Sequence, residues 1–359
     1  MSARFAISRG HLIADLLRGS WRSTNKLKSN CTPAQLEDIT SLLINSGSGA
    51  LAWTQIKHSE LRDTSCGAEL QHIYRHYAVQ AVLYRRAISE AVATLRAAKI
   101  EPILVKGWLA ARNYCDEGLR PTGDIDVCVH PNQFAAACDV VNKWSGWQLD
   151  LHCGFEKFGS EKFDELADRA MHAALDDVEV RVPCPEDHLR ILVSHMLREG
   201  AWRPVWLCDV AAAAESASEQ FDWDRCFGRN KHSANWIICA LRLAQELLDA
   251  RIESIPVAHA ARKLPAWIAQ TIFNEWGTAE PSMRQRHRVP MSTHIDRREN
   301  VTRGLASRWP NSIEATVALR RSFNKFPRFP YQLATYLTRA SSFVPRAASV
   351  VAHQRIESA

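Results

Sequence analysis

The segment from Asp124 to Val129 constrains the fold most, because acidic and apolar residues alternate along it with the period of a β-strand. Its isoleucine and two valines would occupy one face of the strand, and Asp124 and Asp126 would share the other. Aspartate is depleted in strands and neighbouring like charges repel each other, so this arrangement costs stability unless a cation or water compensates. The pattern therefore predicts a sheet strand whose carboxylates have a specific purpose.

A second alternating segment follows at residues 147–153, where Leu149 and Leu151 alternate with Asp150 and His152. If this segment pairs with the first, Asp150 joins the two aspartates. Magnesium prefers oxygen ligands and is often held by one or two carboxylates plus substrate phosphates. We therefore predict a divalent metal site at these aspartates, and the alternative is an ordinary solvent-exposed edge of the sheet.

A basic turn precedes the acidic strand. The apolar run Ile103–Val105 ends in Lys106-Gly107, and residues 108–114 read as a helix. A strand, a turn and a helix in this order suit phosphate binding, and Gly107 would let the backbone approach a phosphate group. Lys106 and Arg120 place positive charge near the acids, as expected where a polyphosphate and its metal are held together. The alternative is that both residues are only ion-pair partners.

The motifs Lys106-Gly107, Arg120-Pro121-Thr122-Gly123-Asp124-Ile125-Asp126 and Asp150-Leu151-His152 stand in this order in the chain. In this the chain resembles the nucleotidyltransferase superfamily with the DNA polymerase beta fold. More narrowly, it is similar to an uncharacterised bacterial family with a Lys-Gly turn, an Arg-Pro-x-x-Asp-x-Asp strand and an Asp-Leu-His strand. The resemblance covers roughly residues 70 to 215 and includes the helix that opens at Pro185-Glu186-Asp187. The superfamily usually has Gly-Gly or Gly-Ser at the turn, and the lysine here shifts the expected phosphate contact to Lys106.

The resemblance implies an α+β fold, with a small mixed-sheet nucleotidyltransferase core flanked by N-terminal and C-terminal helical regions. It implies magnesium-dependent transfer of a nucleoside monophosphate from an NTP, with ATP favoured, to a hydroxyl of a small molecule, peptide or protein, with release of pyrophosphate. Two Mg²⁺ ions would be held by the catalytic residues Asp124, Asp126 and Asp150, and Asp150 would also be a candidate base. The implied nucleotide-binding residues are Lys106, Gly107, Arg120 and His152.

Two other polar residues admit two interpretations. His195 lies in an apolar helical segment, where a hydrogen-bonded core histidine is favoured over a ligand. Asp209 would either face the cleft or pair with a nearby arginine such as Arg203. His152, which is expected to point the same way as Asp150, is either a substrate contact or a packed histidine.

The expected organisation has five parts. They are an N-terminal helical region (1–97), the nucleotidyltransferase core (98–184), a C-terminal helical domain (185–277), a linker (278–304) and a basic tail (305–359). Helices are predicted at 34–44, with Thr32 as N-cap, and at 68–98. Residues 154–175 are expected to be helical in part, and 178–182 to form a strand.

Composition favours an intracellular enzyme. The chain is 46% hydrophobic and 23% charged, which allows a large core. The ten cysteines form no C-x-x-C pair, so neither a zinc site nor a disulfide framework is indicated. The sequence shows no continuous signal-peptide core and no apolar stretch of transmembrane length, and we expect a cytoplasmic protein.

The positive charge is concentrated at the C-terminal end. Residues 301–359 contain nine Arg or Lys against two Glu, and this excess accounts for the whole net charge of +6. Between 320 and 331 cations alternate with aromatic residues, a pattern that suits RNA, an anionic membrane or an acidic partner protein. The alternative function is therefore a catalytically inactive scaffold that binds RNA, a membrane or a partner through its tail. A transferase acting on tRNA is a third possibility. The structural alternative for the tail is that it packs on the body of the protein and binds nothing.

Overall fold

The structure is a computed structural model that describes residues 3–23, 31–155, 162–252, 264–278, 309–339 and 341. Its N-terminal helices are α1 (Ala3–Leu17), α2 (Pro33–Asn45), α3 (Gly49–Ile56) and the long α4 (Ser65–Ala97), with the 3₁₀ turn η1 (Glu60–Asp63) before α4. The helices after the sheet are α8 (Pro185–Arg198), α9 (Pro204–Glu215), α10 (Trp223–Phe227), α11 (Lys231–Leu248), α13 (Ala266–Thr278) and α17 (Ser312–Ala318). Residues 329–339 are also helical.

Local sequence signals explain where two of the N-terminal helices begin. Thr32 and Gln35 form a capping box at the start of α2, in which each side chain accepts a hydrogen bond from the other residue's backbone amide. The hydroxyl of Thr64 caps α4 by accepting a hydrogen bond from the amide of Gly67. Both predicted helices, at 34–44 and 68–98, are therefore confirmed to within a few residues.

The sheet has five strands in the order β3-β2-β1-β5-β4. They are β1 (Ile103–Leu104), β2 (Ile125–Val129), β3 (Leu149–Cys153), β4 (Met171–Leu175) and β5 (Val178–Val182). β1 pairs antiparallel with β2 and parallel with β5, β2 pairs parallel with β3, and β4 pairs antiparallel with β5. Shorter helical elements connect them: α5 (Gly107–Ala111), η2 (Glu117–Leu119), η3 (Pro131–Gln133), α6 (Phe134–Asn142) and α7 (Phe163–Ala167).

Residues 154–175 are helical in part, as expected, and they also contain strand β4, which the sequence did not indicate. The segment is helical at α7, but its last five residues are a strand that forms a hairpin with β5. Ala173 and Leu175 are buried on one side and their neighbours are exposed, so the strand period is present. The two alanines weaken the strand signal in the sequence, and pairing with the confirmed strand β5 outweighs their local preference.

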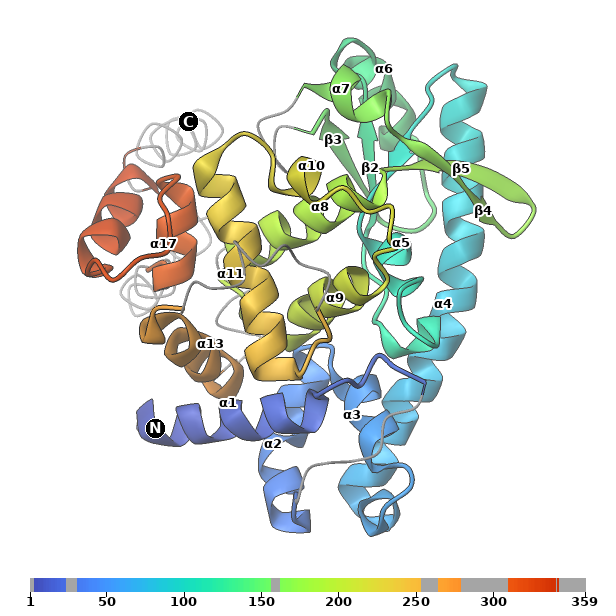
Figure 1. The fold of residues 1–359 in the computed structure, drawn as a ribbon. Helices are drawn as coiled ribbons and strands as arrows, with labels where there is room; N and C mark the ends of the chain where they lie inside the picture. Colours follow the sequence, from blue (N-terminus) through green and yellow to red (C-terminus); the bar gives the residue numbers. More distant parts are fainter. Residues whose placement is uncertain are drawn as a thin grey trace, which may run out of the picture.

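The two faces of the sheet meet different helices. Ile125, Val127 and Val129 pack in one hydrophobic cluster with the C-terminal half of α4, which lies along the sheet (Figure 1). On the opposite face, Cys128 packs in a smaller cluster with residues of α7 and with Ile191 of α8. The predicted alternation along β2 is thus confirmed, and it directs Asp126 away from α4 towards the helices that follow the sheet.

A separate, larger cluster joins helices from both ends of the chain. Helix α1 packs against α13 (Figure 1), and the two backbones come closest together at one glycine of each helix. A Cβ at Gly10 would lie 2.1 Å from the carbonyl oxygen of Phe273, and one at Gly277 would lie 1.8 Å from that of Ala6. Only glycine allows these backbones to approach so closely. The N-terminal and C-terminal helical regions therefore share one core, and the proposed domain limits stay a prediction.

The described part of the C-terminal tail packs on the body. Ile313, Val317 and Phe323 belong to the large core cluster, and the buried Arg328 stacks its guanidinium on Trp267 and Tyr331. Two tryptophans of the body also donate hydrogen bonds to backbone carbonyls of the tail. Residues 309–339 therefore pack on the body, which is the structural alternative to a tail that binds RNA, a membrane or a partner. The predicted linker at 278–304 lies, apart from Thr278, outside the described residues.

Candidate functional site

The basic turn has an unusual backbone. Lys106 follows β1 with φ 54° and ψ −136°, a region that non-glycine residues rarely adopt and that costs roughly 1–3 kcal/mol. Gly107 also has a positive φ, and a Cβ there would lie 2.5 Å from the hydroxyl oxygen of Tyr84. The turn is therefore held between β1 and α4 with no room for a side chain at Gly107. The helix that follows, α5, is shorter than the predicted helix over 108–114.

Asp126 and Asp150 occupy directly opposed positions on the parallel strands β2 and β3. Residues in register on one face of adjacent strands lie close together, so the pairing brings the two side chains to the same place. The imidazole Nε2 of His152 lies 3.0 Å from Oδ1 of Asp126 and 3.4 Å from Oδ2 of Asp150. The predicted juxtaposition of the two strands and their acids is thus present.

Lys106 completes the electrostatic environment of Asp126. Its ammonium Nζ lies 2.7 Å from Asp126 Oδ1, the same oxygen that His152 contacts. Burial alone would raise the pKa of Asp126, but the His152 hydrogen bond and the Lys106 charge outweigh it, so the pKa lies below its usual value. Asp126 is therefore a carboxylate at neutral pH.

Asp124 lies one residue before β2, and its backbone carbonyl accepts a 2.8 Å hydrogen bond from the hydroxyl of Tyr84. Its side chain lines the same cavity as Lys106, Asp126 and Asp150, a hollow of about 270 Å³. Among the described residues, the ligand atoms that lie within 4.8 Å of one another belong to Asp126, Asp150 and His152. The structure therefore brings Asp124 to the cavity but not into this closest group.

Arg120 is held by a carboxylate from another helix. Its guanidinium makes two hydrogen bonds to Asp209 on α9, at 2.8 and 3.0 Å, and Tyr114 donates a third to the same carboxylate at 2.7 Å. Asp209 is 1% exposed, so this is a buried, bidentate ion pair. Both interpretations of Asp209 apply: the residue lines the cavity and is paired, and its partner is Arg120 rather than Arg203. Arg120 still lines the cavity, and its role in nucleotide binding stays a prediction.

The opposite wall of the cavity comes from α8 and from the start of α9. His195 packs edge-to-face on Trp206, and burial, with Lys106 nearby, lowers its pKa to about 3. It is therefore neutral at pH 7, which agrees with the packed interpretation, although the residue also lines the cavity. Arg203 stacks on Trp206 and donates a 2.9 Å hydrogen bond to the carbonyl of Ser46.

No sequence pattern indicates Tyr84, Arg203 and Trp206 as site residues. None belongs to a motif. Arg203 and Trp206 line the cavity from the start of α9, and Tyr84 on α4 reaches the site through its hydrogen bond to the Asp124 carbonyl. The Arg-Pro pair at 203–204 repeats the Arg-Pro pair of the motif at 120–121, but this repetition is too common to predict a site. Only the tertiary arrangement identifies these residues.

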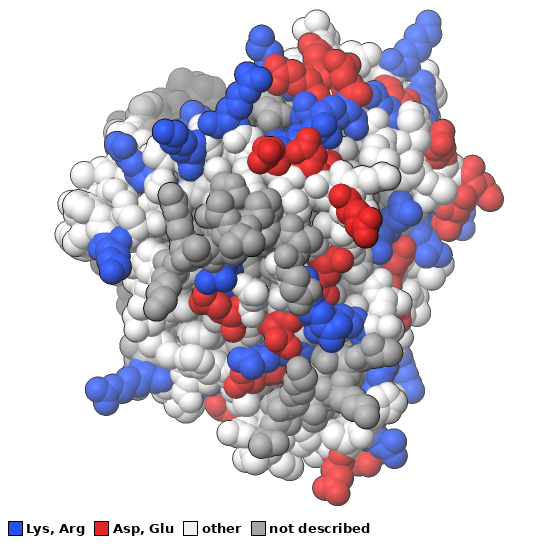
Figure 2. All heavy atoms as spheres, viewed as in Figure 1, with Lys and Arg blue, Asp and Glu red and all other residues white. Residues whose placement is uncertain are grey.

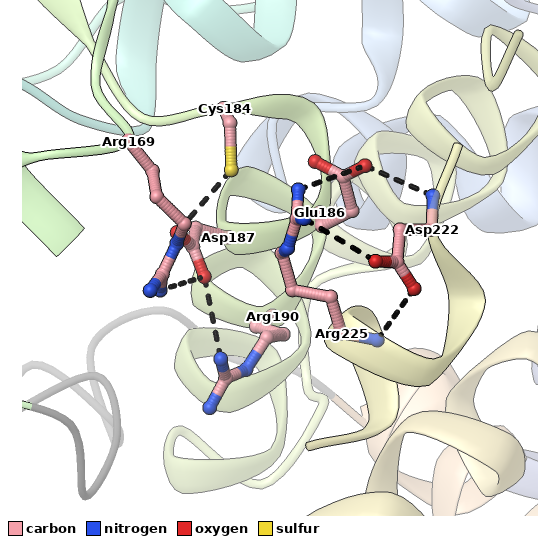
Figure 3. Close-up of polar contacts among 7 residues, drawn as sticks. All are labelled: Arg169, Cys184, Glu186, Asp187, Arg190, Asp222 and Arg225. Atoms are coloured by element: carbon pink, nitrogen blue, oxygen red, sulfur yellow. Dashed lines mark hydrogen bonds and ion pairs between the residues drawn. The ribbon is translucent and has the colours of Figure 1, made fainter. Parts of the chain in front are cut away.

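A buried polar network fixes the start of α8, which forms this wall (Figure 3). Asp187, fully buried, accepts hydrogen bonds from Arg169, Arg190 and the thiol of Cys184. Glu186 accepts one from the backbone amide of Asp222, which caps α10. These bonds tie the sheet-proximal end of α8 to its neighbours and so support the position of the cavity wall.

The donor set fits a divalent cation that prefers oxygen. Two carboxylates of different strands converge within reach of one ion, and the side chain of Asp150 is 46% exposed. Mg²⁺ is usually bound by one or two carboxylates with water and phosphate oxygens as the other ligands. The imidazole of His152 also suits Mn²⁺ or Zn²⁺, so the residues alone do not select the ion.

A mixed sheet with opposed aspartates on adjacent strands, beside a basic turn and a polar cavity, defines a nucleotidyltransferase-type core. The model of a family described as "Uncharacterised nucleotidyltransferase" matches residues 32–249. The match spans more than half of the chain, and the protein belongs to this family. The family match confirms both the resemblance and the α+β fold class. It covers more of the chain than residues 70–215, the region that contains the motifs. No curated protein and no solved structure matches the chain.

Two further findings bear on the setting of the protein. None of the helices that the structure describes is both long and apolar enough to cross a bilayer. All ten cysteines lie in described residues and none of them is in a disulfide, as the spacing of the cysteines indicates.

Proposed function

We propose that the protein transfers a nucleoside monophosphate from an NTP to a hydroxyl group of an acceptor and releases pyrophosphate. The observation that carries this proposal is the register of Asp126 and Asp150 beside Lys106, at the wall of a polar cavity in a nucleotidyltransferase-family chain. The proposed acceptor is a small molecule, a peptide or a protein.

In this proposal Asp126 and Asp150 hold divalent cations, with Asp124 joining them from the same cavity. Bound Mg²⁺ would neutralise the triphosphate and raise the acidity of the acceptor hydroxyl. Because Asp126 carries a lowered pKa, it is ionised and ready to bind a cation throughout the neutral range. His152 contacts both carboxylates and orients them.

Lys106 and Asp150 have distinct roles in the transfer. Lys106 would exchange part of its contact with Asp126 for a non-bridging oxygen of the triphosphate, and Gly107 would allow the backbone to approach. Asp150, the more exposed carboxylate, would accept the hydroxyl proton. The hydroxyl oxygen then bonds to the α-phosphorus, the bond from that phosphorus to the bridging oxygen breaks, and pyrophosphate leaves with the electron pair.

Arg120 has a positioning role in this proposal. Its guanidinium is fixed on Asp209, so it contributes positive charge to the cavity without needing to move. This charge, partly offset by the Asp209 carboxylate, favours the triphosphate, and the two hydrogen bonds to Asp209 hold the planar guanidinium in one orientation. A direct bond from Arg120 to phosphate would require it to give up part of this pair.

Labelled NTPs test the proposal. Wild-type protein with Mg²⁺ and a cell extract as the acceptor source should transfer label from the α-phosphate, and none from the γ-phosphate, to a product that the label then identifies. Asp126→Asn/Asp150→Asn should lose this transfer, whereas Asp63→Asn, at an exposed site on η1, should keep it.

Three results would oppose the proposal. Equal transfer by the double aspartate variant would mean that the paired carboxylates do not carry the reaction. Transfer of the γ-label would indicate a kinase. Binding of no NTP with metal present would favour the alternative, a scaffold of this fold without turnover.

A further inference from the structure

A second cavity, of about 380 Å³, lies between α8, α11 and α17. It shares no lining residue with the cavity of the candidate active site. Helix α8 separates the two: Leu192 and His195 line the first, whereas Arg190 and Arg198 line the second. At about 100° per residue these pairs project from different sides of the helix. The second cavity is therefore a distinct site on the same structural element.

Arginine dominates the lining of this cavity. Four arginines contribute to it, and Glu314 is the one carboxylate among its lining residues. The four are Arg190, Arg198, Arg320 and Arg339. Glu314 is paired with Arg339 at 2.6 Å, so it is not available to compensate the other arginines fully.

Arg198 and Arg320 carry the uncompensated charge. Within the described part of the chain, neither side chain has a hydrogen-bond or ion-pair partner. The two come from different elements, α8 and the residues after α17, and converge on one hollow. Burial, with Arg320 nearby, also lowers the pKa of Arg198. Both arginines are open to solvent, so water screens their mutual repulsion, and a bound anion would supply a direct counter-charge for both.

Arg190 adds to the same field. Its guanidinium donates to Asp187 at 3.3 Å, but Arg169 donates to the same carboxylate at 3.0 and 3.2 Å (Figure 3). Arg190 thus brings a guanidinium to the cavity lining while it also contacts Asp187. On the face drawn in Figure 2, basic and acidic side chains are mostly interspersed.

The rest of the lining supplies polar side chains and one flat aromatic surface. The side chain of His232 is held by Ser322, with its Nδ1 2.9 Å from the serine Oγ, and Asn230 caps α11. Trp236 is fixed by a hydrogen bond from its indole to the carbonyl of Arg321. An aromatic wall beside arginines suits a ligand with an apolar or planar part attached to its charged groups.

We propose that this cavity binds a small organic molecule with two or more phosphate groups, at a site separate from the one that would process the NTP. Guanidinium groups recognise phosphate through paired hydrogen bonds, and several arginines in one hollow favour a multiply charged ligand over a single carboxylate. The volume falls within the range of roughly 300–1,000 Å³ typical of small-molecule sites. The proposal does not depend on catalysis at the other cavity.

Calorimetric titration in EDTA at low ionic strength, with inorganic pyrophosphate, tripolyphosphate and ADP as probes, tests this inference. Without divalent metal the aspartate site contributes little to phosphate binding. Wild type and Asp126→Asn/Asp150→Asn should bind at least one probe with similar affinity. Arg198→Gln/Arg320→Gln should bind that probe at least tenfold more weakly, and Arg62→Gln/Arg86→Gln, which removes two exposed arginines elsewhere, should bind like wild type.

The outcomes separate this site from the candidate active site. Binding that survives the arginine substitutions, or that fails in the aspartate variant instead, overturns the inference, as does the absence of binding for all three probes. Arg198→Lys/Arg320→Lys keeps the charge and should retain more affinity than the glutamine variant. The far-ultraviolet circular dichroism and the thermal midpoint of each variant show whether lost binding reflects a lost fold.

Discussion

Asp126 on β2 and Asp150 on β3 face each other in register, and the imidazole of His152 lies within 3.4 Å of both carboxylates. Nineteen residues between the two strands, including α6, form the crossover that makes the strands parallel. A change of one residue in this register would turn Asp150 towards α4 and separate the acids. The geometry of the candidate site therefore depends on strand pairing as much as on the residues themselves.

Asp209→Asn is expected to destabilise the fold strongly. The substitution leaves the Arg120 guanidinium at a buried position without its charged partner, which costs about 3–5 kcal/mol of unfolding free energy. Urea unfolding followed by tryptophan fluorescence measures this loss. Asp63→Asn, at an exposed position, is the matched control and should change stability by less than about 0.5 kcal/mol. A similar small effect at Asp209 would mean that the Arg120 pair is not important for the fold.

Gly107→Ala should destabilise the turn through Tyr84. The added Cβ would lie 2.5 Å from the Tyr84 hydroxyl, and relief of such overpacking typically costs about 1–3 kcal/mol. In a Tyr84→Phe background the hydroxyl is absent, so the same substitution should cost less. A double-mutant cycle of unfolding free energies measures the coupling between the two positions. Additive effects would show that the contact does not limit Gly107.

Stability should fall in mild acid because of His188. Burial, with Arg120 nearby, lowers the pKa of His188 to about 3 from 6.5. Between these values the unfolded chain binds a proton that the folded chain does not, so the free energy of unfolding decreases as the pH falls from about 6.5 towards 3. The slope for one such group is about 1.4 kcal/mol per pH unit.

Replacing this histidine isolates its contribution. His188→Leu should reduce the slope of unfolding free energy against pH between pH 6 and 5, whereas His72→Gln, at an exposed position on α4, should leave it unchanged. An unchanged slope in His188→Leu would assign the acid sensitivity to other groups. A lower overall stability of the leucine variant does not affect this comparison, because the slope is the quantity compared.

The sequence predicts the acidic strand, the basic turn and the second aspartate because each depends on short-range periodicity. Asp126 and Lys106 could be found in this way, and their direct contact agrees with the expectation that opposite charges gather at the site. The pairing of Arg120 with Asp209 could not be found, because 89 residues separate them and several acids were possible partners. The packing of α9 against α5 brings Asp209, rather than another acid, to Arg120.

Local propensity also misses β4 and the true extent of the helical core. A five-residue strand with two alanines carries little signal of its own, and its hairpin with β5 is a tertiary preference. The close approach of α1 and α13 depends on Gly10 and Gly277, which lie at opposite ends of the chain. No periodicity within either helix indicates that these two glycines meet the other helix.

The most direct test of the account is the equilibrium affinity for Mg²⁺-ATP, measured by calorimetric titration with and without the paired aspartates. Wild type is predicted to bind Mg²⁺-ATP, and to bind ATP at least tenfold more weakly in EDTA. Asp126→Asn/Asp150→Asn should lose this dependence on magnesium while it remains folded. Equal binding by wild type and the double variant, or no metal-dependent binding of any NTP by wild type, would contradict the assignment of Asp126 and Asp150 as the cation site.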